Sequence, residues 1–146
     1  MSIAIVAVGR VRDKRHQGLI DEYQKRLRAP WDIEFFEIKE GKGQQPDDVK
    51  QREGSDLVSK CDGRWVIALE EAGKQFDSIA FSKKLQSWMD DAKKPAFVIG
   101  GAHGLSDAVR ERADVVMSLS DLTFPHEMAR MILVEQIYRA MTIANG

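Results

Sequence analysis

Short apolar segments alternate with segments of helical periodicity along the whole 146-residue chain, and this alternation limits the folds it can adopt. The apolar segments are rich in β-branched residues and short enough to be buried strands. They span residues 3–8, 33–38, 65–69, 96–99 and 115–119. Strands that alternate with helices form a mainly parallel sheet with helices on both faces. We therefore predict one α/β domain over residues 1–146.

The helices between these strands are predicted from apolar spacing and capping residues. They are expected over residues 13–27, from 47 or 48 to 60, over 78–93, in a short stretch after Leu105, and from Thr123 or Phe124 onward. Ser78 and one of the two aspartates at 47 and 48 are expected as N-caps. Pro125 suits the first turn of the last helix. Residues 40–46 predict a polar loop and residues 70–74 a turn.

Several classes of protein are excluded by composition. No apolar run approaches the roughly 18 residues needed to cross a bilayer, and residues 1–9 have neither a basic leader nor a cleavage-type ending. The single cysteine, Cys61, permits no intramolecular disulfide and is typical of the reducing cytoplasm. His16, His103 and His126 are too far apart for metal-ligand spacing. We expect no metal, no membrane partner, and surface exposure for His16.

Charge is nearly balanced overall, at a net −1, but it is uneven along the chain. Residues 10–28 carry seven bases against three acids, a local balance of +4. The bases are Arg10, Arg12, Lys14, Arg15, Lys25, Arg26 and Arg28. This segment is either a phosphate-facing patch or a solvated helix face.

The last predicted helix is apolar on nearly every side, with few polar interruptions after residue 127. A helix that is apolar all round must be buried all round. In a domain this small one face can meet the sheet, while another needs a covering layer. We therefore predict a homodimer built partly on this helix.

A glycine-rich loop follows the strand at residues 96–99 and precedes a helix. Its G-G-x-x-G spacing at residues 100–104 differs from the G-x-G-x-x-G of dinucleotide-binding loops. Loops at strand ends of open α/β sheets bind ligands. Gly100 and its neighbours therefore bring backbone close to a ligand or form a tight turn with positive φ.

Three segments together resemble one family. They read ALEEAGK at residues 68–74, FVIGGAHGL at 97–105, and LSDLTFPH at 119–126 with the helix through EQIYRA at 135–140. The opening IVAVG at 5–9 matches too. The chain resembles the small ribosomal RNA methyltransferases of the SPOUT superfamily. These enzymes methylate N3 of a pseudouridine in the large-subunit (23S) RNA, in the decoding region between the subunits.

This resemblance implies a C-terminal trefoil knot, a homodimer, and S-adenosylmethionine as methyl donor without a metal. The implied cofactor-binding residues are Leu69, Gly100, Gly101, Leu119, Ser120, Asp121, Leu122, Thr123 and Phe124. His126 is the candidate base, and Arg130 and Arg139 are candidates to hold phosphate or polarise a base carbonyl. The family carries a Tyr-His-basic tail after the last helix, whereas the printed sequence ends at Gly146. No tail residue therefore receives a role.

The implied substrate is 23S RNA on the assembled ribosome, because the sequence shows no added RNA-binding domain. DNA is not an expected partner. Two alternatives come from other classes. A nucleotide-cofactor oxidoreductase would bind NAD in preference to S-adenosylmethionine, and a non-catalytic ribosome-binding module would bind particles without a methyl donor.

Overall fold

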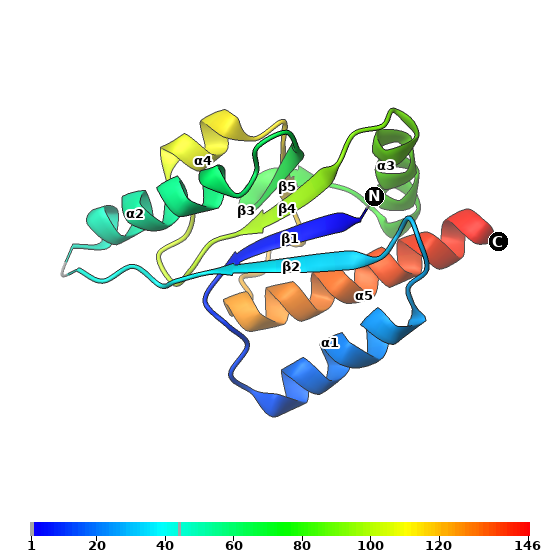
Figure 1. Ribbon diagram of the computed structural model, residues 1–146, viewed down its shortest axis with the longest axis horizontal. Coiled ribbons are helices and arrows are strands. Elements are labelled where there is room, and N and C mark those ends of the chain that lie inside the picture. The colour runs from blue at the N-terminus through cyan, green and yellow to red at the C-terminus, as the bar shows by residue number, and fades with distance from the viewer. Residues whose placement is uncertain (1, 44) are drawn as a thin grey trace.

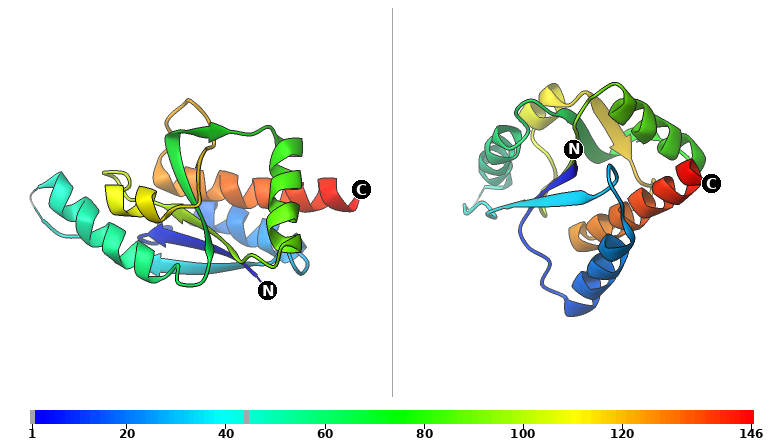
Figure 2. Two further views of the ribbon diagram at one scale, coloured as in Figure 1. Left: turned by 90° about the horizontal axis from the view of Figure 1, so that it is seen from above. Right: turned by 45° about the vertical axis from the view of Figure 1, so that its right-hand side comes forward.

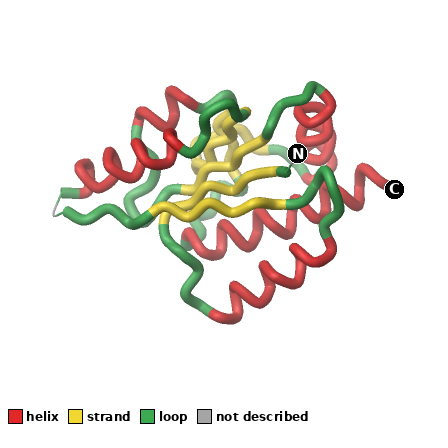
Figure 3. The backbone as a smooth tube through the Cα atoms, viewed as in Figure 1, coloured by secondary structure: helices red, strands yellow, loops and turns green. Residues whose placement is uncertain are grey.

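The computed structural model describes residues 2–43 and 45–146 and has an α/β fold around one five-stranded sheet (Figure 1; strands are yellow in Figure 3). The strands are β1 (Ile3–Val8), β2 (Ile33–Ile38), β3 (Trp65–Gln75), β4 (Pro95–Ile99) and β5 (Val115–Ser118). Their order is β2-β1-β4-β3-β5, and every neighbouring pair is parallel. The predicted parallel sheet is confirmed.

Helices cover both faces of the sheet, as predicted. The helices are α1 (Lys14–Arg26), α2 (Pro46–Ser59), α3 (Ser78–Asp90), α4 (Asp107–Arg112) and α5 (His126–Asn145). Helices α2 and α4 pack together on one face, and α5 packs against both α1 and α3 on the other (Figure 2). None of the helices within the described ranges is long and apolar enough to cross a membrane.

Strand β1 shows how one apolar segment supplies two cores. Successive side chains of a strand point to opposite faces of the sheet. Ile3 and Ile5 accordingly pack with α1, α3 and α5, whereas Val6 and Val8 pack with α2 and α4. All six β1 residues are at most 2% exposed. The absence of polar alternation in this segment is thus explained by burial on both sides.

Helix α5 lies between α1 and α3, and this position accounts for part of its apolar circumference. Leu133, Val134 and Ile137 are fully buried in the core shared with the sheet. Met131 and Tyr138 are half-buried, and the Tyr138 ring lies 5.5 Å from the Tyr23 ring of α1. Helices of the same chain therefore bury part of the apolar surface of α5 for which the sequence analysis invoked a second copy. The homodimer stays a prediction.

The expected turn at residues 70–74 is wrong, because β3 continues to Gln75. Leu69 pairs with Met117 of β5, the register then shifts, and Lys74 pairs with Met117 again. Gly73 permits this second approach. A Cβ at Gly73 would lie 2.7 Å from backbone atoms of Met117, closer than real Cβ atoms come. A turn-forming glycine therefore serves here as a point of close strand contact.

Several element boundaries also differ from the predictions. Asp77, not Ser78, caps α3 by accepting a hydrogen bond from the Ala80 N–H at 2.7 Å. Gln45 precedes α2 without a side-chain cap, so the expected cap at residue 47 or 48 is wrong. Pro125 is the N-cap of α5, which begins one residue later. Helix α3 ends at residue 90 and β5 at residue 118. Short polar residues near a helix start compete for the cap, and local sequence does not decide between them.

Candidate functional site

A cavity of about 910 Å³ lies at the carboxyl ends of β3, β4 and β5. Its walls come from residues 69–72 in the second half of β3, from residues 99–105 at and after the end of β4, and from residues 119–126 before and at the start of α5, except residue 121. Arg110 of α4 and Ala129 of α5 complete the lining. This is where open parallel sheets place ligands, and the volume suits a molecule of nucleoside size or larger.

Most of the residues implied as cofactor contacts surround this one cavity. Eight of the nine line it: Leu69, Gly100, Gly101, Leu119, Ser120, Leu122, Thr123 and Phe124. The ninth, Asp121, is not part of the lining and accepts a hydrogen bond from Gln75 Nε2 at 2.6 Å. Segments 50 residues apart in the sequence are thus brought together by adjacent strand ends.

The glycine-rich loop is a tight turn in its own right. The Gly104 N–H donates to the Gly101 carbonyl at 3.0 Å, and Gly104 has a φ of +83°. A Cβ at Gly100 would lie 2.8 Å from the Gly104 carbonyl group. The tight-turn interpretation is therefore confirmed. The close approach of this backbone to a ligand stays a prediction, consistent with the loop's place in the cavity wall.

The segment between β5 and α5 is held by its serines. Ser118 Oγ donates to the Ser120 carbonyl at 2.9 Å, and Ser120 Oγ accepts from the Leu122 N–H at 3.0 Å. These short-range bonds shape a loop whose apolar side chains remain available to a ligand. Leu122 is 71% exposed although it lines the cavity.

The sequence analysis missed the ion pair in the cavity wall. Arg110 of α4 donates through Nε and Nη2 to the Glu70 carboxylate, with the Nε–Oε1 contact at 2.8 Å. This contact raises the pKa of Arg110 above its usual value. Both side chains line the cavity. They are 40 residues apart in sequence, and nothing local to either position indicates the other.

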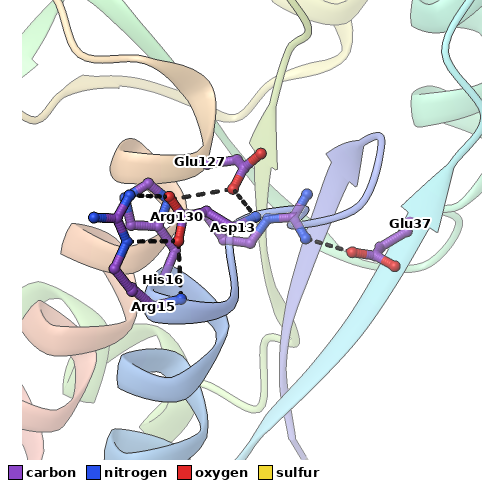
Figure 4. Close-up of polar contacts among 6 residues, drawn as sticks. All are labelled: Asp13, Arg15, His16, Glu37, Glu127 and Arg130. Carbon is purple, nitrogen blue, oxygen red and sulfur yellow. Dashed lines mark hydrogen bonds and ion pairs between the residues drawn. The ribbon is translucent and has the colours of Figure 1, made fainter.

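The three catalytic candidates lie in different surroundings. His126 lines the cavity at the first position of α5. Arg130 is 3% exposed and donates to Glu37 of β2 at 2.5 Å (Figure 4). It also donates to the Gly9 carbonyl at 2.9 Å. Arg139 is half-exposed and pairs with Glu135 on its own helix. The structure thus brings only His126 to the cavity.

A second polar cluster joins the start of α1 to the start of α5 (Figure 4). His16 Nδ1 lies 3.2 Å from Glu127 Oε1, and the Asp13 N–H donates to the same oxygen at 3.3 Å. Burial opposes ionisation of Glu127, but these hydrogen bonds outweigh it and lower the Glu127 pKa. His16 is therefore a contact between two helices, and the expectation of a simple surface residue is wrong.

Much of the basic segment at residues 10–28 is engaged within the chain. Arg12 pairs with Glu40 at 3.3 Å, Arg15 with Asp13 at 2.8 Å, and Arg26 with Glu22 at 3.0 Å. Arg28 donates to two backbone carbonyls of the α1 end. Four of the seven bases thus have partners within the chain, which favours the solvated face over a phosphate-facing patch.

Potential metal ligands do not gather in the part of the chain that the structure describes. No group of three or more His, Cys, Asp or Glu side chains there could hold a metal ion. Cys61 is buried and burial raises its thiol pKa, as expected for a packing residue.

A parallel α/β sheet with a ligand-sized cavity across three strand ends defines a small-molecule-binding domain of the open-sheet class. Comparison with known families makes this specific. A family model described as "Predicted SPOUT methyltransferase" matches residues 1–146. The chain belongs to the SPOUT methyltransferase family, as the sequence motifs predicted.

Relatives of similar length carry one name. The chain is 42% identical to the ribosomal RNA large subunit methyltransferase H of Gemmatimonas aurantiaca, over 100% of this chain and 97% of the relative. The protein of that name from Gluconacetobacter diazotrophicus is 40% identical, over 97% and 92%. That from Gloeobacter violaceus is 39% identical, over 100% and 96%.

Solved structures show the same fold at low sequence identity. A methylase family protein from Neisseria gonorrhoeae aligns with a TM-score of 0.57 and 14% identity, over 93% of this chain and 81% of that one. The SpoU methyltransferase AviRb from Streptomyces viridochromogenes, in complex with AdoMet, aligns with a TM-score of 0.50 and 12% identity. That match covers 96% of this chain and 58% of AviRb.

Proposed function

We propose that this protein transfers a methyl group from S-adenosylmethionine to N3 of a pseudouridine in 23S ribosomal RNA, on the assembled ribosome. The names of the full-length relatives support an activity on large-subunit ribosomal RNA. The observation that carries the proposal is the convergence of eight implied cofactor contacts on one cavity. The donor, the target atom and the ribosomal context are parts of the proposal.

The cavity fits S-adenosylmethionine in size and chemistry. Its volume of about 910 Å³ accommodates a nucleoside joined to an amino acid. Leu69, Leu119 and Leu122 offer an apolar surface for the adenine ring. The Glu70–Arg110 pair adds charged groups at the same wall. AviRb, whose fold is similar, was solved with AdoMet.

The mechanism assigns the protein's residues to positioning and to removal of one proton. S-adenosylmethionine supplies an activated methyl group when bound. The loops at residues 99–105 and 119–126 would orient it toward the RNA base, and orientation is the larger part of such catalysis. His126 would accept the N3 proton, because it is the one of the three catalytic candidates that lies in the cavity wall, and its imidazole can act as a base.

Of the two arginine candidates, Arg139 stays available for a contact with RNA and Arg130 does not. Arg139 is 54% exposed and could leave Glu135 for a phosphate. Arg130 is fixed by Glu37 and the Gly9 carbonyl, so in this proposal it acts by holding the start of α5, and with it His126, against the sheet. The trefoil knot, the homodimer and the cytoplasmic location belong to the same proposal.

Calorimetric titration of S-adenosylmethionine, followed by methyl transfer to ribosomes that lack the modification, tests the proposal. We expect saturable binding and a new methyl group on N3 of one pseudouridine. Leu122→Ala should weaken cofactor binding several-fold. Ile79→Ala is the matched control, because Ile79 is also an exposed aliphatic residue, at 59%, outside the cavity.

Three outcomes would contradict the proposal. Absence of cofactor binding by the folded protein would remove the donor. Preference for NAD would favour the oxidoreductase alternative. Ribosome binding without methyl transfer would favour a non-catalytic ribosome-binding module.

A further inference from the structure

A second cavity, of about 610 Å³, lies where β3 leads into α3. Its lining includes Lys74, Lys83 and Lys84, together with Gln75, Phe76 and Asp77. We call this cavity the lysine groove. It shares no residue with the cavity at the strand ends, and nothing in the proposed methyl transfer uses it.

The positive charge of the lysine groove is only partly offset by the residues that line it. No ion pair involves Lys74, Lys83 or Lys84 among residues 2–43 and 45–146. Asp77, which caps α3 through the Ala80 N–H, is the acid in the lining, so three lysines against one carboxylate leave a balance of +2 (3 − 1). The basic segment at residues 10–28 differs, because its arginines are largely paired. Among the described residues, the lysine groove is thus the cationic surface with fewer internal ion pairs.

The side chains of the groove form a continuous track. Lys83, Lys84 and Ser87 lie three, four and seven positions after Ala80, so all four share one face of α3. Lys74 reaches the groove from β3, and its Nζ lies 5.4 Å from the centre of the Phe76 ring. Amines beside an aromatic ring are the combination that binds single-stranded nucleic acid through phosphates and base stacking.

Strand β3 connects the lysine groove to the candidate active site. Residues 69–72 line the first cavity, and residues 74–77 line the groove. Gln75 also donates a hydrogen bond to Asp121, in the loop between β5 and α5 that forms the first cavity. Between the two cavities, Gly73 packs against the Met117 backbone. A polymer whose target unit meets the cofactor at the first cavity can therefore reach the lysines with its neighbouring units.

We propose that the lysine groove binds backbone phosphates of the single-stranded RNA segment next to the target nucleotide. This inference rests on the proposed function, since it assumes an RNA substrate, and it names a surface that the methyl-transfer chemistry does not require. Lysine amines contact phosphates as mobile point charges and specify no sequence. The groove thus contributes affinity and register, while the first cavity holds the cofactor that the base must meet.

The test compares two charge-neutralised variants of the full chain. Lys83→Gln/Lys84→Gln alters the groove. Lys60→Gln/Lys94→Gln is the control, because those exposed lysines precede β3 and β4 and so lie at the opposite, amino edge of the sheet. Binding of purified 70S ribosomes is measured over a range of salt concentrations. Cofactor titration and sedimentation are measured on the same samples.

The groove variant should bind ribosomes about tenfold more weakly at low salt than the control. Its log–log salt dependence should be shallower by about 1.4, because each phosphate contact on a single strand contributes about 0.7. The KM for ribosomes should rise while kcat and cofactor affinity stay unchanged.

Four results decide the matter. Equal affinity and salt slope in the two variants would overturn the groove assignment, even if the wild type methylates ribosomes. Dissociation of an oligomer in the groove variant alone would also overturn it, because the groove would then contact a second copy of the chain. A wild type that binds ribosomes but transfers no methyl group would refute the proposed function. If the groove variant then still bound ribosomes more weakly than the control, the RNA-binding role of the lysine groove would be supported. A wild type that binds no ribosomes would overturn both.

Discussion

The two halves of α5 are held in different ways. Near the cavity, Glu127 contacts His16 of α1, and Arg130 contacts Glu37 of β2, across 111 and 93 residues of sequence. Toward the C-terminus, Arg139 pairs with Glu135 one turn away on the same helix. Apolar packing runs through both halves. Long-range hydrogen bonds reach the second half as well, from Ser78 and Ser82 of α3 to Gln136 and the Ala140 carbonyl. The half that carries His126 is therefore the half that charged side chains tie to distant segments.

This difference bears on function because a cavity wall must be fixed more accurately than a packed helix end. Hydrogen bonds and ion pairs are directional, so these contacts fix the orientation of the first turns of α5. His126 and Ala129 line the cavity in the same turns that carry Glu127 and Arg130. Substitutions in the first half should therefore change cofactor binding as well as stability, and those in the second half should change stability alone.

The largest expected effect is from Leu133→Ala, at the middle of α5. Leu133 is 0% exposed and lies in the main core, so its truncation should cost about 3 kcal/mol of unfolding free energy. Met141→Ala, in the second half at 7% exposure, should cost less. Urea denaturation measures both. Equal losses would mean that packing is uniform along the helix.

Arg130→Ala should come next and gives the sharpest test of the comparison. It removes the ion pair to Glu37 and the hydrogen bond to Gly9 from a buried position. We expect a loss of about 2 kcal/mol in unfolding free energy, and weaker S-adenosylmethionine binding because the cavity wall shifts. Denaturation and calorimetry on one sample measure the two effects. Unchanged cofactor affinity would show that this contact does not position the wall.

Glu127→Gln should destabilise the protein by about 1 kcal/mol at neutral pH, by weakening the bonds to His16 and Asp13. The native pKa of Glu127 is lowered, so the unfolded state binds a proton more readily. Its stabilising contribution is therefore present above the unfolded value of 4.5 and is lost as pH falls through the native pKa. Denaturation from pH 7 to pH 3 should show a smaller acid-induced loss in the variant. A parallel loss in both proteins would assign the acid sensitivity to other carboxylates.

Arg139→Ala should have the smallest effect, at most about 0.5 kcal/mol, because an exposed pair within one helix is screened by solvent. Cofactor affinity should not change. Thermal unfolding with and without added salt measures the stability effect. A larger loss than that of Arg130→Ala would reverse the comparison. A selective rise in the KM for ribosomes would instead support an RNA contact at Arg139.

The loops that form the cavity wall could be predicted from the sequence, whereas the ion pair beside them could not. The glycine loop and the segment around Phe124 were found because small residues and a proline directly follow apolar strands. The parallel sheet then brings such strand ends to one edge, whichever residues lie between them. The Glu70–Arg110 pair had no local signal, because its two charges meet only through the packing of α4 against β3.

The sequence by itself determined the order of strands and helices and the burial of β1, because these follow from apolar periodicity within a few residues. It left the tight turn at Gly104 as one of two alternatives. Only the tertiary structure decided that β3 continues past Gly73, that Arg130 is buried against Glu37 and that the arginines of residues 10–28 are mostly paired. These features depend on contacts between segments that are distant in sequence, and such contacts form only when the chain folds. Such contacts override local turn signals and local charge balance.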